Sequence, residues 1–180
     1  MSIKVRRRIR IPWSPFHIAL APPGGAMLPV PYVMQSANNW CWAACGEMLF
    51  RHRGQPSLTQ CALAAAQFHQ TCCISPTPSA CDLGCWPDEA YPAHGMTVTP
   101  VYSAMTVAQV QGQLAAGRPV QVCYKWTGGD QTHVALIIGE HPNGDFEVLD
   151  PYRDYGRAAR RFSQITGAYG LGTWIRSFTF

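Results

Sequence analysis

The chain has 180 residues, of which 47% are hydrophobic and 13% are charged. This composition excludes a disordered protein, and the length allows one domain, either whole or divided into two small lobes. The net charge of +4 comes from a basic N-terminus, since the residues from 11 onward include 9 basic and 10 acidic side chains. We therefore expect no nucleic-acid footprint over the body of the protein.

Residues 1–28 are predicted to form a basic and proline-rich extension. Within it, the segment IKVRRRIRI at residues 3–11 alternates apolar and basic side chains, as an edge strand does. The uncharged stretch that follows, from residue 11 to 46, is interrupted by prolines and cannot form a membrane-spanning helix. Prolines and a histidine also break the apolar part of any signal sequence, so we expect neither a membrane span nor a cleavable leader.

Three helices are predicted in the first half of the chain. The first covers residues 41–52 and is ended by a glycine and a proline. The second follows a capping box made by Ser57 and Gln60, and the third begins after a capping box made by Thr106 and Gln109. A cysteine- and proline-rich loop separates the second helix from the third.

Strands are predicted after residue 118, where β-branched and aromatic residues become frequent. They cover residues 119–126, 132–140, 145–151 and 172–180. The chain is therefore predicted to have an α+β fold. A helical lobe, residues 29–118, would pack on an antiparallel β lobe, residues 119–180, with the active site between them.

The chain contains eight cysteines, and seven remain if one of them is a catalytic nucleophile. Cys123 lies in an apolar strand and is predicted to be buried. The other six could form up to three disulfides, in fifteen possible pairings. An alternative is a cysteine-rich zinc-binding interaction module, whose ligands would come from Cys72, Cys73, Cys81 and Cys85 with His69 or His94.

Cys41 is the candidate nucleophile. It occupies the first turn of a predicted helix, where the positive end of the helix dipole favours a thiolate. Gln35 lies six residues earlier, and its side-chain amide could join the backbone N–H of Cys41 in stabilising an oxyanion. The alternative for Cys41 is a disulfide or a place in the core.

A base and its orienting carboxylate are predicted on two neighbouring strands. His133 opens one strand, Asp150 ends the next, and an Asn-Gly turn signal at residues 143–144 joins them. A loop of two or of four residues would place Asp150 across from Ile137 or Ala135, on the face that carries His133. With the longer loop the two side chains would meet, and the carboxylate would orient the imidazole.

These residues, together with the segments NNWCWAAC, HVALIIG and DFEVLDP, resemble the papain-like cysteine peptidases. The chain is most similar to the bacterial avirulence-effector branch, whose triad is Cys, His and Asp, over residues 29–150. The resemblance implies that Cys41 attacks a peptide carbonyl and that His133 transfers the proton. It also implies that Asp150 holds His133 and that Gln35 completes the oxyanion hole.

The resemblance has further implications for the site and its partners. Trp40 or Trp42 would shield the thiolate–imidazolium pair and contact the substrate, with a plain core role as the alternative. No metal or cofactor is expected. The substrate would be a protein or peptide, and the enzyme would be an effector or toxin delivered into a target cell by a leaderless route. An antibacterial version would need an inhibitory immunity protein.

Two other functions remain open at this point. The same triad serves amidases, deamidases and acyl transferases, because an acyl-enzyme does not dictate which nucleophile resolves it. A nucleic-acid or membrane binder could use the N-terminal RRRIR segment and a second basic cluster made of Arg153, Arg157, Arg160 and Arg161.

Overall fold

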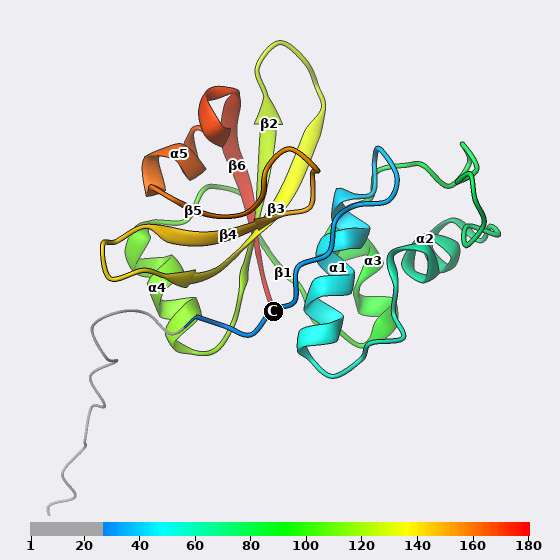
Figure 1. The fold of residues 1–180 in the computed structure, drawn as a ribbon, viewed down its shortest axis with the longest axis horizontal. Coiled ribbons are helices and arrows are strands. Elements are labelled where there is room, and N and C mark those ends of the chain that lie inside the picture. Colours follow the sequence, from blue (N-terminus) through cyan, green and yellow to red (C-terminus); the bar gives the residue numbers. More distant parts are fainter. Residues whose placement is uncertain (1–26) are drawn as a thin grey trace, which may run out of the picture.

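The computed structural model of this chain describes residues 27–180. Helices and a six-stranded antiparallel sheet form the molecule, so the predicted α+β class is confirmed (Figure 1). The edge strand predicted at residues 3–11 lies outside the described residues. Within residues 27–180, no helix is long and apolar enough to cross a lipid bilayer.

The strands of the sheet lie in the order β1-β6-β2-β3-β4-β5. Their bounds are β1 Thr99–Val101, β2 Val120–Trp126, β3 Thr132–Glu140, β4 Phe146–Asp150, β5 Gly156–Arg160 and β6 Gly172–Thr179. The four predicted strands are all present, with each end within one residue of its predicted position. The sequence did not predict β1 or β5, because β5 reads GRAAR, without aromatic or β-branched residues, and forms by pairing along the whole of β4.

The helices fall into two groups (Figure 1). One side of the molecule holds α1 (Cys41–His52), α2 (Gln60–Phe68), α3 (Pro87–Ala90) and the 3₁₀ turn η1 (Pro92–His94). The sheet side holds α4 (Val107–Ala115), α5 (Phe162–Thr166) and the 3₁₀ turn η2 (Ala168–Gly170). The predicted helical lobe, residues 29–118, includes β1 and α4, but these lie on the sheet, where Val110 and Leu114 of α4 are buried.

The helix starts were predicted with mixed success. The first helix has the predicted bounds, and Thr106 and Gln109 form the predicted capping box of α4. The prediction of a capping box made by Ser57 and Gln60 is wrong, because Thr59 is the N-cap of α2. Gln60 is used elsewhere, since its backbone N–H donates to a buried carboxylate of α1 and its side chain bonds to the segment before α1.

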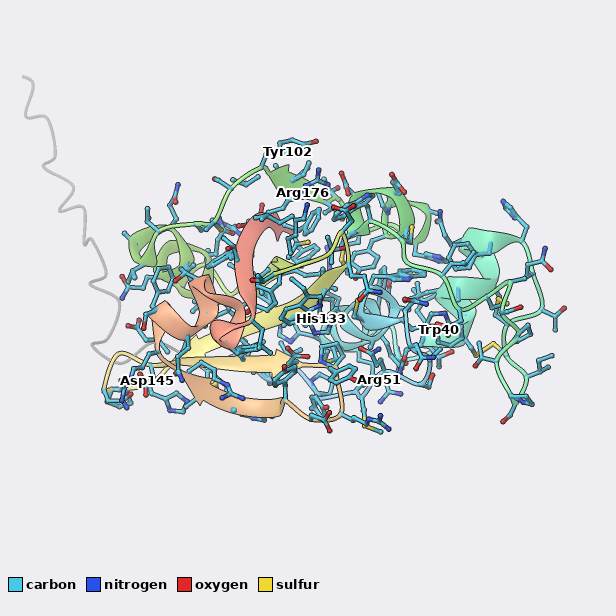
Figure 2. All side chains as sticks on the ribbon, turned by 90° about the horizontal axis from the view of Figure 1, so that it is seen from above. Trp40, Arg51, Tyr102, His133, Asp145 and Arg176 are labelled. Carbon is cyan, nitrogen blue, oxygen red and sulfur yellow. A yellow bond between two sulfur atoms is a disulfide. The ribbon has the colours of Figure 1, made fainter. Side chains whose placement is uncertain are left out.

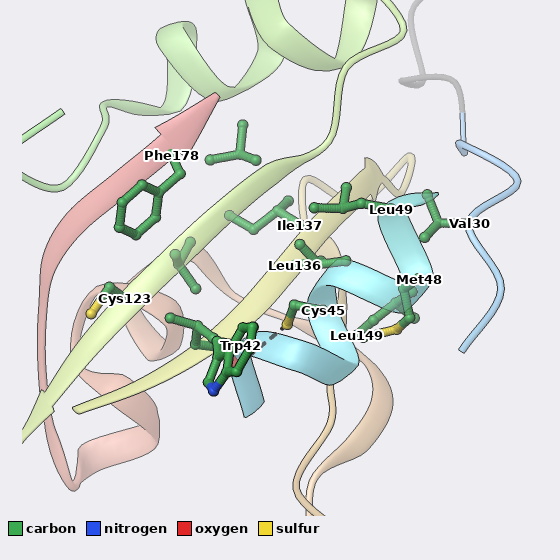
Figure 3. Close-up of a cluster of buried hydrophobic side chains, with 14 of the residues drawn as sticks. Val30, Trp42, Cys45, Met48, Leu49, Cys123, Leu136, Ile137, Leu149 and Phe178 are labelled. Carbon is green, nitrogen blue, oxygen red and sulfur yellow. Dashed lines mark hydrogen bonds between the residues drawn. The ribbon is translucent and has the colours of Figure 1, made fainter. Parts of the chain in front are cut away.

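The core is built around α1, whose residues 42–50 are all buried. Figure 3 shows side chains of α1 and β3 in one cluster, among them Cys45 and Leu136. Gly46 permits the close approach of Tyr91 to α1, because a Cβ atom there would lie 2.8 Å from the ring of Tyr91. Burial of each large apolar side chain contributes about 2 kcal/mol, so the helix that begins at the candidate nucleophile is firmly held.

Two disulfides hold the cysteine-rich loop, Cys61–Cys73 and Cys72–Cys81. Cys123 is fully buried, as predicted. Three of the four cysteines considered as zinc ligands are therefore oxidised and cannot coordinate a metal. The zinc-binding interpretation is wrong for this reason.

The hairpin that joins β3 to β4 differs from both predicted loops. Glu140 pairs with Phe146, so the loop is residues 141–145, and a bulge between Ile137 and Gly139 shifts the register by one residue. Beyond the bulge, Leu136 pairs with Leu149. The next position opposite Asp150 is thus Ala135, as predicted from the four-residue loop, because the bulge cancels the odd loop length.

The second basic cluster is partly engaged within the fold. Arg157 forms an ion pair with the buried Glu147, which also bonds to His141. The guanidinium of Arg160 lies 5.0 Å from the ring centre of Tyr169. These contacts explain two of its four arginines as structural residues.

Candidate active site

A cleft of about 850 Å³ lies where the helical side meets the sheet. The helical side contributes Asn39, Cys41 and Trp42 to its walls, and the sheet side contributes Trp126, His133 and Tyr152. Figure 2 shows His133 near the middle of the molecule, beside the helix that begins at Cys41. The two residues predicted to react together therefore share one cleft.

Cys41 is the first residue of α1, and its thiol is free and half-buried. The N–H groups of a first helical turn have no acceptor within the helix. The backbone N–H of Cys41 is therefore available to a group bound in the cleft, and the helix dipole places positive potential at the sulfur.

His133 is the second residue of β3 and is only 6% exposed. Its Nε2 atom lies 2.7 Å from Oδ1 of Asp150. The thiol of Cys41 lines the same cleft, and because Asp150 engages Nε2, Nδ1 is the nitrogen left available to the sulfur. The structure thus brings the predicted base between the predicted nucleophile and the predicted carboxylate.

The electrostatics of this pair favour a charged imidazole. Burial alone would lower the pKa of His133, but hydrogen bonds and charges from Asp150 and Cys41 raise it to about 10. An imidazolium is therefore the stable form at neutral pH, and it is the partner that stabilises a nearby thiolate.

Asp150 is 1% exposed, and both of its carboxylate oxygens have partners. Oδ1 accepts from His133 and from the backbone N–H of Tyr152 at 2.9 Å. Oδ2 accepts from the hydroxyl of Tyr169 at 3.0 Å. A buried carboxylate needs such donors, since an unpaired charge in the interior is strongly unfavourable.

Gln35 lies near the site, but its side chain is turned to its own loop. The backbone N–H of Gln35 donates to the carbonyl of Pro151 at 2.9 Å, next to the end of β4. Its Nε2 atom donates to the carbonyls of Ala37 at 2.9 Å and Asn38 at 2.8 Å, which uses both amide hydrogens. Its Oε1 atom is buried without a hydrogen-bond partner in the described residues.

The two predicted tryptophans are both 1% exposed and anchor the loop after the second disulfide. Trp40 donates from Nε1 to the carbonyl of Cys81 at 2.6 Å, and Trp42 donates to the carbonyl of Leu83 at 3.0 Å. Trp42 also lines the cleft, whereas Trp40 does not.

The aromatic cover of the imidazole comes from residues that the sequence analysis missed. The ring of Trp126 stacks on His133 with centroids 5.6 Å apart, and Tyr124 stacks at 6.4 Å. Tyr124 pairs directly with His133 across β2 and β3, so Trp126 shares the same face. Aligning the two predicted strands, residues 119–126 and 132–140, as an antiparallel pair would have placed Tyr124 and Trp126 beside His133.

The fold and the site together define the class of papain-like cysteine peptidases. Residues 26–164 match the family described as papain-like cysteine protease AvrRpt2. This match covers most of the chain, and the chain belongs to that family. Among curated proteins, none matches the sequence.

Two solved structures are similar in fold. The peptidase domain of ComA from Streptococcus, a bi-functional ABC transporter involved in a quorum-sensing pathway, aligns with a TM-score of 0.56 and 16% identity, over 83% of this chain and 97% of that one. Xylellain, a cysteine protease from Xylella fastidiosa, aligns with a TM-score of 0.52 and 12% identity, over 89% and 87%. At such identities the likeness establishes the fold alone.

Proposed function

We propose that this papain-like cysteine protease is an endopeptidase that cleaves protein substrates with Cys41, His133 and Asp150. The observation that supports the proposal best is the 2.7 Å hydrogen bond between His133 and Asp150, in the wall of a cleft that also contains the free thiol of Cys41. In this arrangement Asp150 orients the imidazole and balances its charge.

The reaction would proceed through an acyl-enzyme. The sulfur of Cys41 forms a bond to the peptide carbonyl carbon, and the C=O electron pair moves to the oxygen. As the C–N bond breaks, the imidazolium of His133 gives its proton to the leaving amine. Neutral His133 then takes a proton from a water molecule that attacks the thioester, which releases the acid product and restores the thiolate–imidazolium pair.

The oxyanion would be stabilised by the backbone N–H of Cys41 and by the amide of Gln35. Their six-residue spacing and the tie between Gln35 and Pro151 support this role. One amide hydrogen of Gln35 must leave its loop carbonyl to reach the oxyanion, because both are engaged in the free protein. Removing one oxyanion donor typically costs on the order of a hundredfold in kcat, so Gln35→Ala tests this role.

The cleft walls would exclude water and contact the substrate. Trp126, stacked on His133, would shield the thiolate–imidazolium pair, a role that the resemblance implied for Trp40 or Trp42. Trp42 would contact the substrate from the helical side, since it lines the cleft. Trp40 would act indirectly, by fixing the loop at Cys81.

We further propose that the enzyme is a bacterial effector or toxin delivered into a target cell. Membership of the AvrRpt2 family supports this role. An antibacterial version would be accompanied by an immunity protein that blocks the cleft. Expression in a bacterium with and without candidate neighbouring proteins tests this, and harmless expression in both bacterial and host cells would argue against it.

The activity is tested by incubating the protein with a cell proteome and mapping new N-termini. We expect cleavage by the wild type and at least a thousandfold loss in Cys41→Ala and in His133→Ala, with the fold retained. An electrophilic epoxide should label Cys41 and spare the buried Cys45. Absence of new N-termini together with conversion of glutamine to glutamate would instead identify a deamidase, and transfer to an added amine would identify an acyl transferase.

A further inference from the structure

A tyrosine outside the cleft holds the carboxylate of Asp150. Tyr169, in η2, donates its hydroxyl proton to Oδ2 of Asp150 at 3.0 Å. Within residues 27–180, Tyr169 is the hydrogen-bond donor to Oδ2, while Oδ1 accepts hydrogen bonds from His133 and from a backbone N–H. The carboxylate plane is thus fixed at both ends, with Oδ1 aimed at the imidazole.

The backbone that carries Tyr169 is in a conformation that side chains rarely adopt. Ala168 has a φ of 44° and Tyr169 a φ of 61°, so two successive non-glycine residues are left-handed. Such residues are strained and are found where the surroundings over-determine them, often at functional sites. The strain here turns the Tyr169 ring towards Asp150.

Neighbouring rings keep Tyr169 in this position. Tyr155 lies 4.8 Å from it between centroids, and Tyr124 packs edge-on at 5.4 Å. The Tyr124 hydroxyl lies 3.4 Å from the Tyr169 hydroxyl and donates to it, which leaves the Tyr169 proton directed at Asp150. Burial, followed by the influence of Tyr124 and Asp150, raises the pKa of Tyr169 well above its usual value, so the phenol remains a donor at any working pH.

We infer that Tyr169 is a positioning residue of the peptidase site, which acts through Asp150 to hold His133 in its reactive orientation. The inference rests on the proposed function of Asp150 and His133. Tyr169 does not line the cleft, and its substitution should therefore change the reaction step and leave substrate binding intact.

The test is Tyr169→Phe, which keeps the ring and its contacts and removes only the donor. We expect kcat to fall about tenfold with KM unchanged, as for the loss of a charged hydrogen bond at the reacting groups. Proton NMR provides a second readout, because the Nε2–H of His133 bonded to a carboxylate gives a low-field signal. In Tyr169→Phe this signal should move upfield and exchange faster with water, because the carboxylate is free to turn.

Two controls separate positioning from a general loss of stability. Tyr91→Phe removes another buried tyrosine hydroxyl, which bonds to the carbonyl of Trp42 at 2.6 Å, and should leave the His133 signal in place. In an Asp150→Asn background, Tyr169→Phe should cause little further loss of kcat. If Tyr169→Phe is too unstable, 3-fluorotyrosine at position 169 keeps every contact and changes only the donor strength, which should shift the same signal.

The outcomes distinguish the inference from the function on which it rests. A wild-type kcat and an unmoved signal in Tyr169→Phe, or a full tenfold loss in the Asp150→Asn background, would overturn the positioning role. The NMR signal does not depend on turnover. If the protein cleaved no peptide, a shifted signal would still support the contact while the peptidase proposal failed.

Discussion

Asn39 forms two hydrogen bonds with Asp82, which lies in a loop distant in the sequence. Its backbone N–H donates to the Asp82 carboxylate at 2.7 Å, and its side-chain amide donates to the Asp82 carbonyl at 2.8 Å. Asn39 lies two residues before Cys41, and Asp82 directly follows the disulfide-bonded Cys81. The cross-linked loop therefore supports the segment that leads into Cys41, the proposed nucleophile.

Replacing Asp82 should impair catalysis more than stability. In Asp82→Ala the approach to Cys41 loses a charged hydrogen bond, and we expect about a tenfold fall in kcat/KM, because small displacements of reacting groups are costly. Steady-state kinetics and urea unfolding measure the two effects. Asp154→Ala, which removes an exposed carboxylate that does not itself line the cleft, is the control, and an equal loss in that variant would contradict this account.

Removing the Cys72–Cys81 disulfide should destabilise the protein and loosen the same support. The loop it closes spans nine residues in sequence separation, and chain-entropy arguments predict a loss of about 3 kcal/mol for Cys72→Ser with Cys81→Ser. Urea unfolding measures the loss. Cys123→Ser serves as the control for replacing a cysteine outside the disulfides, and a double variant as stable as wild type would show that the bond adds nothing.

The imidazole of His133 should remain protonated well above neutral pH. Its pKa is raised to about 10 by Asp150 and Cys41 despite the opposing effect of burial. The corresponding stabilisation is complete below the ordinary histidine pKa of about 6.5 and is lost as the pH rises through about 10. NMR titration of the labelled histidine checks the value, and Asp150→Asn should lower it by at least one unit; titration near 6.5 in the wild type would refute it.

Glu147 should stabilise the protein in a pH-dependent manner. Burial alone would raise its pKa, but hydrogen bonds and charges from His141 and Arg157 lower it below the usual value. The stabilisation is therefore present above about pH 4.5 and is lost as the pH falls through the lowered pKa. We expect Glu147→Gln to cost about 2 kcal/mol at pH 7 and much less at pH 3, measured by urea unfolding. If Glu147→Gln lowered the free energy of unfolding equally at pH 7 and at pH 3, this role would be excluded.

The fold was largely predictable because its signals are local. Strand-forming residues after position 118 predicted four strands, and the segment that begins at Cys41 predicted the first helix with its bounds. The β5 strand was missed because pairing with β4, and not its own composition, makes it a strand. The predicted capping box of Ser57 was wrong for a similar reason, since the backbone N–H of Gln60 donates to the buried carboxylate of Glu47.

The meeting of His133 and Asp150 was predictable from strand parity, even though the loop between them was not. Side chains alternate along every strand, and a bulge restored the parity that the loop length had broken. The fate of the Gln35 amide was not predictable in this way. Its two hydrogens are taken by nearby carbonyls whose positions depend on how the loop packs.

The sequence alone determined where the reactive residue types stand on their helix and strands, because helix starts and strand alternation depend on neighbours along the chain. Only the tertiary structure decided which side chains from distant segments surround them: the disulfide partners, Asp82 behind Asn39, and Tyr169 on Asp150. These contacts join residues 9 to 43 positions apart in the sequence, so their geometry depends on how separate segments of the chain pack together.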